Sequence, residues 1–203
     1  MSDKLNNVIF DFGNVIIRWR PYRALSGIFS NETEMQETLS KIGFFDWNLK
    51  QDQGRSWEEA MFVAERDMPE HAHIFRAYVD GLLPAHSELV PGTSELIEAL
   101  DANGRALFGM TNAAEASFGI VKQAAPVIGL MRDVVVSATE GFAKPDPRIF
   151  ELCLLRNGLP AGTCLFVDDS LANCQTAQKL GIVAHHFTNA DGLKTDLLRH
   201  GLL

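Results

Sequence analysis

The chain reads VIFDFGNVI over residues 8–16: an apolar run ends in Asp11, Gly13 and Asn14 before the sequence turns apolar again. An unbroken apolar run bounded by turn residues is typical of a strand buried on both faces, as in parallel sheets. Open parallel sheets bind ligands in the crevice at the carboxyl ends of their strands. We therefore expect Asp11 to face that crevice, where Gly13 allows the backbone to approach a ligand closely.

Composition narrows the class of protein. The chain has 203 residues, of which 46% are hydrophobic, enough for one sizeable core and a small second domain. A net charge of −8 argues against a nucleic-acid partner. The three cysteines form no CxxC pair, which indicates reduced, buried thiols and a cytoplasmic location. Residues 1–7 are polar and no apolar run approaches 18 residues, so we expect neither a signal peptide nor a membrane partner.

The sequence pattern of residues 21–83 is typical of helices. Ser56 and Glu59 have the spacing of a capping box, and the segment Ser30–Glu34 combines capping residues with first-turn acids. The pattern predicts an all-helical insertion. We place this domain at residues 18–85 and the main domain at residues 1–17 and 86–203.

Beyond Pro91, strand and helix patterns alternate. Helices are predicted over 93–102, 147–157 and 171–180, and strands over 105–110, 134–136, 164–167 and 182–187. Such alternation is typical of an α/β fold with a doubly wound parallel sheet. Because the insertion leaves the carboxyl end of the first strand, we expect it to lie over the crevice.

Four polar groups follow or flank these strands: the Asp11 motif, Thr111-Asn112, Lys144-Pro145 and Asp168-Asp169. The alternation brings all four to one edge of one sheet. Their chemistry suits phosphoryl transfer, with a carboxylate nucleophile and oxygen ligands for a divalent metal. The Thr111 hydroxyl would hold phosphate oxygens, and Lys144 would neutralise phosphoryl charge and keep Asp11 ionised.

Each group alone has a simpler interpretation. The Asp11 motif resembles a strand-ending turn, Thr111-Asn112 a helix cap, Lys144 a solvated loop lysine, and Asp168-Asp169 a helix start favoured by its dipole. Their joint occurrence, in this order and beside apolar strands, favours a functional site.

On these motifs the chain resembles the haloacid dehalogenase-like (HAD) hydrolase superfamily over nearly its whole length, in the branch whose first motif is written DxGNV. The resemblance implies a Rossmann-like core, a helical C1 cap in the insertion, and a Mg²⁺-dependent phosphatase. The substrate would be a small phosphorylated metabolite, with a sugar phosphate expected. By similarity Asp11 and Lys144 are catalytic. The implied metal ligands are Asp11, Asp169, the Gly13 carbonyl, and Asp168 directly or through water; the implied substrate-binding residues are Gly13, Asn14, Thr111, Asn112 and Lys144.

One position departs from the family. Most family phosphatases have a second aspartate two residues after the nucleophile, as general acid and base, whereas this chain has Gly13. General acid–base help is worth on the order of 10²–10⁴-fold. The sequence thus predicts a slow phosphatase that favours good leaving groups.

Two other functions stay open. A 2-haloacid dehalogenase would use Asp11 to displace halide without a metal, although Asp168 and Asp169 favour the phosphatase. A non-catalytic phosphate-binding or regulatory module is supported mainly by Gly13. Substrate choice is expected from the insertion, first from the junction residues Arg18, Trp19 and Arg20 and then from Gln53, Arg55 and Trp57. The sequence gives no oligomeric state.

Overall fold

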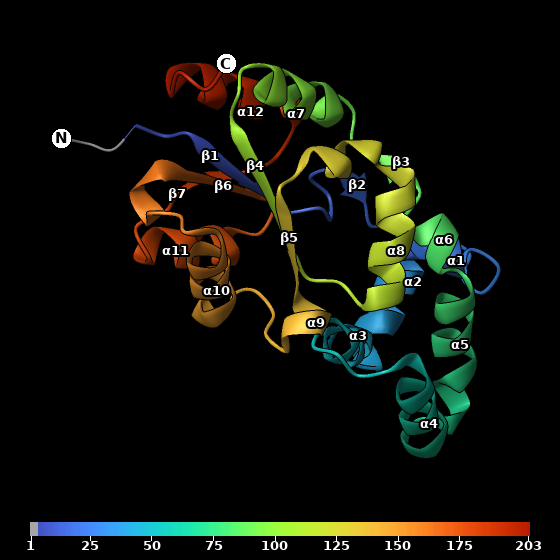
Figure 1. Ribbon diagram of the computed structural model, residues 1–203. Helices are drawn as coiled ribbons and strands as arrows, with labels where there is room; N and C mark the ends of the chain where they lie inside the picture. The colour runs from blue at the N-terminus through green and yellow to red at the C-terminus, as the bar shows by residue number, and fades with distance from the viewer. Residues whose placement is uncertain (1–3) are drawn as a thin grey trace.

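A five-stranded parallel sheet forms the centre of the protein in a computed structural model, which describes residues 4–203 (Figure 1). The strand order is β5-β4-β1-β6-β7. The strands are β1 (Asn7–Phe10), β4 (Ala106–Thr111), β5 (Asp133–Val136), β6 (Cys164–Asp168) and β7 (Val183–His186). The predicted α/β class with a parallel sheet is confirmed. Residues 1–3 of the predicted main domain lie outside the described range.

The register of β1 explains why its sequence is apolar throughout. Phe10 pairs with Gly109 of β4 on one side and with Val167 of β6 on the other, so the strand is central. Val8 and Phe10 pack into one apolar cluster, whereas Ile9 packs into another on the opposite face of the sheet. A strand buried on both faces cannot alternate polar and apolar residues.

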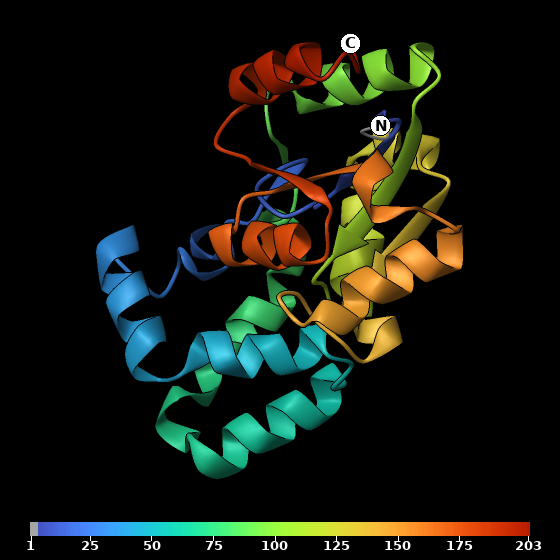
Figure 2. The same cartoon turned by 90° about the vertical axis from the view of Figure 1, so that its left-hand side faces the viewer.

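Helices cover both faces, which makes the sheet doubly wound as predicted (Figures 1 and 2). The first apolar cluster joins the sheet to α7 (Thr93–Ala102), α8 (Glu115–Ala124), η2 (Pro126–Leu130) and α12 (Ala190–Arg199). The second joins it to α10 (Pro147–Asn157) and α11 (Leu171–Lys179). Two short elements, α9 (Ser137–Glu140) and η3 (Ala161–Thr163), complete this part of the chain.

Between Pro21 and Ala85 every described element is a helix. They are α1 (Pro21–Leu25), α2 (Glu32–Lys41), α3 (Phe44–Asp52), α4 (Trp57–Asp67), η1 (Pro69–His71), α5 (Ala72–Asp80) and α6 (Leu82–Ala85). Ser56 caps α4 by accepting a hydrogen bond of 3.1 Å from the backbone N–H of Glu59, as its spacing predicts. These helices share an apolar cluster of their own around Phe44, whose ring centroid lies 4.9 Å from that of Tyr78.

The insertion is joined to the sheet by a structure that the sequence did not predict. Strands β2 (Ile17–Arg18) and β3 (Glu88–Leu89) pair antiparallel at its two ends. Glu88 also accepts ion pairs from Arg18 at 3.0 Å and from Arg23 at 2.5 Å. Two-residue strands are too short to show a periodic pattern, so sequence periodicity cannot reveal them.

None of the helices described over residues 4–203 is long and apolar enough to cross a lipid bilayer.

Candidate active site

A cavity of about 390 Å³ lies where the carboxyl edge of the sheet meets the insertion. The sheet side contributes Asp11, Gly13, Asn14, Thr111, Asn112, Lys144, Asp169 and Asn173 to its wall. The insertion contributes Phe45, Asp46, Asn48, Leu49, Asp52 and Tyr78. The structure therefore brings seven of the eight predicted site residues to one cavity, and the eighth, Asp168, lies directly behind it.

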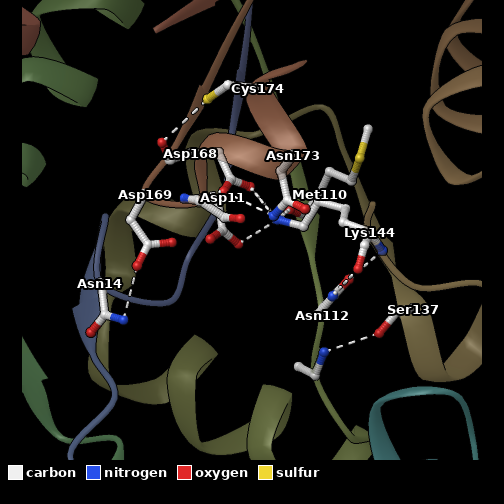
Figure 3. A network of polar contacts seen from close by, with 12 residues as sticks. Asp11, Asn14, Met110, Asn112, Ser137, Lys144, Asp168, Asp169, Asn173 and Cys174 are labelled. Carbon is white, nitrogen blue, oxygen red and sulfur yellow. Dashed lines mark hydrogen bonds and ion pairs between the residues drawn. The ribbon is translucent and has the colours of Figure 1, made fainter. Parts of the chain in front are cut away.

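Lys144 is the centre of the polar network at the sheet edge (Figure 3). Its Nζ lies 2.7 Å from Asp11 Oδ1 and 2.8 Å from Asp168 Oδ2, and it donates to the backbone carbonyl of Met110 at 2.8 Å. The Lys144 side chain is 1% exposed. Burial opposes its charge, but Asp11 and Asp168 outweigh burial and raise the pKa of the Lys144 ammonium. The lysine is therefore a fixed positive charge beside Asp11.

Asn112 holds the backbone that carries this lysine. Its Oδ1 accepts a hydrogen bond from the Lys144 N–H, and its Nδ2 donates to the Lys144 carbonyl, both at 2.8 Å. Both polar ends of the side chain are thus engaged by protein. Sequence analysis predicted Asn112 as a substrate-binding residue, and the contacts add a positioning role that it did not predict.

Asp168 is completely buried and fully hydrogen bonded. Its Oδ1 accepts from the Ser170 N–H at 2.8 Å and from Asn173 Nδ2 at 2.9 Å, while its Oδ2 takes the ammonium of Lys144. A buried carboxylate needs such partners to stay charged. Asn173, which the sequence showed only as part of the fourth motif, supplies one of them.

Asn14 connects the first motif to the fourth. Its backbone has φ 54°, a left-handed conformation that asparagine tolerates better than most residues. In this conformation Nδ2 donates to Asp169 Oδ2 at 3.1 Å, and Oδ1 accepts from the Trp19 N–H at 3.1 Å. On the other side of Asp169, Nε2 of His186 lies 2.9 Å from its backbone oxygen. The Asp169 carboxylate is therefore aimed at Asp11 (Figure 3).

The carboxylates form a candidate metal centre. One oxygen each of Asp11, Asp168 and Asp169 lies within 4.8 Å of the other two. Burial raises the pKa of both Asp11 and Asp169, opposed at Asp11 by Lys144 and at Asp169 by Asn14. Three carboxylates share a single ammonium, so a divalent cation would relieve their repulsion. Carboxylate and carbonyl oxygens are the donors that hard cations such as Mg²⁺ prefer.

Sequence analysis missed two residues of this region, Ser137 and Asp52. Ser137 Oγ accepts from the Ala113 N–H at 3.1 Å and donates to the backbone carbonyl of Asp52. This serine follows β5, so its place at a strand end was a usable signal. Asp52 ends α3 and has no motif around it.

The structure places the residues expected to set substrate choice in different surroundings. Trp19 lines the cavity and donates from Nε1 to the Tyr78 hydroxyl at 3.1 Å. Arg18 instead pairs with Glu88. Arg55 and Trp57 line a separate pocket. The Arg55 guanidinium carbon lies 5.8 Å from the centroid of the Trp47 ring.

Comparison with known proteins gives a consistent result. A family model described as haloacid dehalogenase-like hydrolase matches residues 5–181. The chain is 27% identical over 199 residues to a sesquiterpene phosphatase of Aspergillus oryzae, covering 94% of this chain and 93% of that protein.

Two solved structures have the same fold. A HAD family enzyme from Bacteroides thetaiotaomicron, in a magnesium complex, gives a TM-score of 0.73 at 21% identity and covers 97% of this chain and 100% of its own. A dehalogenase gives a TM-score of 0.65 at 17% identity, covering 91% of this chain and 85% of its own. At these identities the likeness concerns the fold alone.

Proposed function

The chain belongs to the haloacid dehalogenase-like hydrolases, and we propose that it is a Mg²⁺-dependent phosphatase that works through an aspartyl-phosphate on Asp11. The observation that carries the proposal is the Asp11–Lys144 pair, 2.7 Å apart and flanked by Asp168 and Asp169. A binding module needs neither a buried nucleophile nor a fixed ammonium against it.

The residues have distinct tasks in this mechanism. One Asp11 oxygen attacks phosphorus while Lys144 orients the carboxylate and neutralises charge on the phosphoryl oxygens. The ester bond breaks, and water then cleaves the aspartyl-phosphate to release phosphate and restore Asp11. Thr111, 4% exposed at the end of β4, supplies a hydroxyl to the phosphoryl group. The main chain of Gly13 and the Asn14 side chain complete this end of the cavity.

The metal would be held by Asp11, Asp169 and the Gly13 carbonyl, with Asp168 acting directly or through water. When bound, Mg²⁺ screens the repulsion between an anionic nucleophile and an anionic phosphate. We keep the DxGNV assignment of the first motif, which rests on residues 11–15, as part of the proposal.

We assign the insertion, residues 18–85, as a cap domain over a main domain of residues 1–17 and 86–203. Phe45, Leu49 and Tyr78 of the insertion line the same cavity as Asp11, which supports this division. Its role is to enclose the leaving group and to exclude water.

The expected sugar phosphate stays a prediction, and the cavity wall favours a second class of substrate. Its apolar members are Phe12, Ile17, Trp19, Phe45, Leu49, Tyr78 and Val121. Lys144 is the cavity's one lysine or arginine among the described residues, and it is already paired. Such a wall suits a monoester with one phosphate and an uncharged, apolar leaving group. The Aspergillus relative, a sesquiterpene phosphatase by name, supports including prenyl phosphates.

The test is hydrolysis of para-nitrophenyl phosphate with Mg²⁺ and with EDTA. We expect activity that needs Mg²⁺ and is lost in Asp11→Asn, while the exposed Asp101→Asn variant of α7 behaves as wild type. A screen of sugar and prenyl monophosphates then separates the two substrate classes. Halide release from 2-chloropropionate without Mg²⁺ would instead establish the dehalogenase, and phosphate binding without turnover would establish the binding module.

Location and partners follow the same reasoning. We propose a cytoplasmic enzyme whose partner is its small substrate, because Cys153, Cys164 and Cys174 are free and buried, as reduced thiols would be. The net charge of −8 disfavours nucleic acid.

A further inference from the structure

Because residue 13 is a glycine, it supplies no proton donor for the leaving group, although the fold has room for an acidic side chain there. An alcohol leaves phosphorus readily only if its oxygen gains a proton. A Cβ built on Gly13 would meet no atom within 4 Å, and its backbone lies outside the left-handed region. Nothing steric therefore requires glycine there. A phosphatase with this site needs its acid from another part of the chain.

We propose that Asp52, the last residue of α3, is a catalytic residue that protonates the leaving alcohol oxygen. The proposal deepens the phosphatase function above and rests on it. Asp52 lines the same cavity as Asp11 but comes from the opposite wall, the insertion. The leaving group must point toward this wall once the phosphoryl group is placed on Asp11.

Two contacts hold Asp52 against the loop that follows Thr111. The backbone N–H of Ala114 lies close enough to its carboxyl group to oppose the effect of burial on the Asp52 pKa. Its backbone carbonyl accepts from Ser137 Oγ, which in turn accepts from the Ala113 N–H at 3.1 Å. Asn48 Nδ2 also lies 3.4 Å from Asp52 Oδ2. The acid is thus held next to the loop after Thr111, whose hydroxyl we assign to the phosphoryl group.

The surroundings favour the protonated form of this carboxyl group. Burial raises the pKa of Asp52 to about 7, opposed only by the Ala114 N–H. Charged residues on the surrounding elements include Asp46 and Lys50 on α3 itself, Glu58 and Glu59 on α4, and Glu140 on α9, which pairs with Arg156 at 2.7 Å; Glu115 begins α8. None of these is a cause of the Asp52 shift.

The other titratable groups of the cavity are less suited to the task. Asp46 is exposed. Burial lowers the pKa of His86, whose Nδ1 lies 2.9 Å from the Leu82 carbonyl, so its ring is neutral. Burial raises the pKa of the Tyr78 phenol, which makes it a poor acid. Asp11, Lys144 and Asp169 are committed to the nucleophile and the metal.

The proton balance closes over one cycle. Asp11 forms a bond to phosphorus as the ester bond breaks, and the leaving oxygen takes the Asp52 proton to become an alcohol. Water then attacks the aspartyl-phosphate and gives a proton to the Asp52 carboxylate. Phosphate leaves, Asp11 is free again, and Asp52 is again protonated.

The test compares para-nitrophenyl, phenyl and ethyl phosphates, whose leaving groups need a proton to an increasing degree. In Asp52→Asn we expect little change with para-nitrophenyl phosphate and a loss on the order of 10²–10⁴-fold in kcat with ethyl phosphate. The fall of the wild-type ethyl phosphate rate as pH rises through about 7 disappears in this variant. Asp101→Asn, an exposed acid of α7 outside the cavity, keeps the wild-type dependence on the leaving group.

A second variant separates acid catalysis from a structural role. Because position 13 has room for a side chain, Gly13→Asp introduced into Asp52→Asn is expected to restore ethyl phosphate hydrolysis. Equal losses on all three esters, or no rescue, would overturn the assignment of Asp52. The phosphatase proposal would still stand if para-nitrophenyl phosphate hydrolysis needs Asp11 and Mg²⁺, so the two failures are distinguishable.

Discussion

Asn112 clamps the main chain of Lys144 through two hydrogen bonds of 2.8 Å, one from the Lys144 N–H and one to its carbonyl. The two residues lie 32 positions apart and belong to different motifs. The clamp sets where Nζ of the lysine can reach, and hence its 2.7 Å contact with Asp11.

This clamp predicts a catalytic defect in Asn112→Ala. Loss of both hydrogen bonds frees the Lys144 backbone, and a misplaced catalytic group costs on the order of 10²-fold in rate. We expect kcat for para-nitrophenyl phosphate to fall by about that factor, with a smaller change in KM. Asn103→Ala, an exposed position after α7, is the control. A loss confined to KM would instead show that Asn112 contacts substrate.

Removal of the lysine charge should destabilise the fold. Lys144→Met leaves Asp11 and Asp168 buried without their ammonium, which costs about 3–5 kcal/mol for a broken buried pair. Urea denaturation would measure the loss, with the exposed Lys179→Met as control. The double variant Lys144→Met with Asp168→Asn should recover part of it, because the neutral amide no longer needs a counter-charge. Unchanged stability in the single variant would contradict the charge balance described here.

Stability should depend on pH through Asp52. Burial raises the pKa of this carboxyl group to about 7 from its ordinary 3.8, so the folded protein holds the proton more tightly than the unfolded chain. Its contribution therefore weakens as pH rises from about 4 through about 7. We expect Asp52→Asn to raise Tm relative to wild type, with a gain that grows over this range and then levels off. A variant less stable at pH 8 would show that the carboxylate is a structural contact.

Metal binding should stabilise the folded protein apart from any activity. A ligand that binds only the folded state at 100 times its Kd adds about 2.7 kcal/mol. We expect Mg²⁺ to raise Tm of the wild type and to have little effect on Asp169→Asn, since the Asp169 carboxylate faces Asp11 in the acidic cluster. Asp101→Asn should respond as wild type. An equal Mg²⁺ response in Asp169→Asn would move the metal site elsewhere.

The chain enters and leaves the insertion through β2 and β3, and we predict that the insertion moves about these two segments during turnover. Arg18 and Glu88 face each other across β2 and β3, so cysteines at both positions can be tested as a cross-link. We expect oxidation of Arg18→Cys with Glu88→Cys to lower kcat several-fold and reduction to restore it. The native thiols are buried, which limits their interference. An unchanged kcat on oxidation would mean that β2 and β3 need not move relative to each other.

Several elements were predictable because their signals are local. Val8–Phe10 is apolar in succession because a central strand is buried on both faces, and Ser56 with Glu59 marks a helix start by spacing alone. The strand predicted over 105–110 begins and ends one residue later, because Thr111 still pairs with Val136 of β5. The pairing of β2 with β3 was missed, since each strand has only two residues.

The sequence by itself determined the parallel sheet, the helical insertion and the edge where Asp11, Thr111, Lys144 and Asp169 meet. Burial periodicity and turn residues are local patterns of consecutive residues. The carboxyl ends of parallel strands lie at the same edge of the sheet. Only the tertiary structure decided the partners across that edge. The approach of Asp52 to Ala114 and the contact of Ser137 with Asp52, 85 positions apart, leave no local pattern, because they arise when the insertion packs on the sheet.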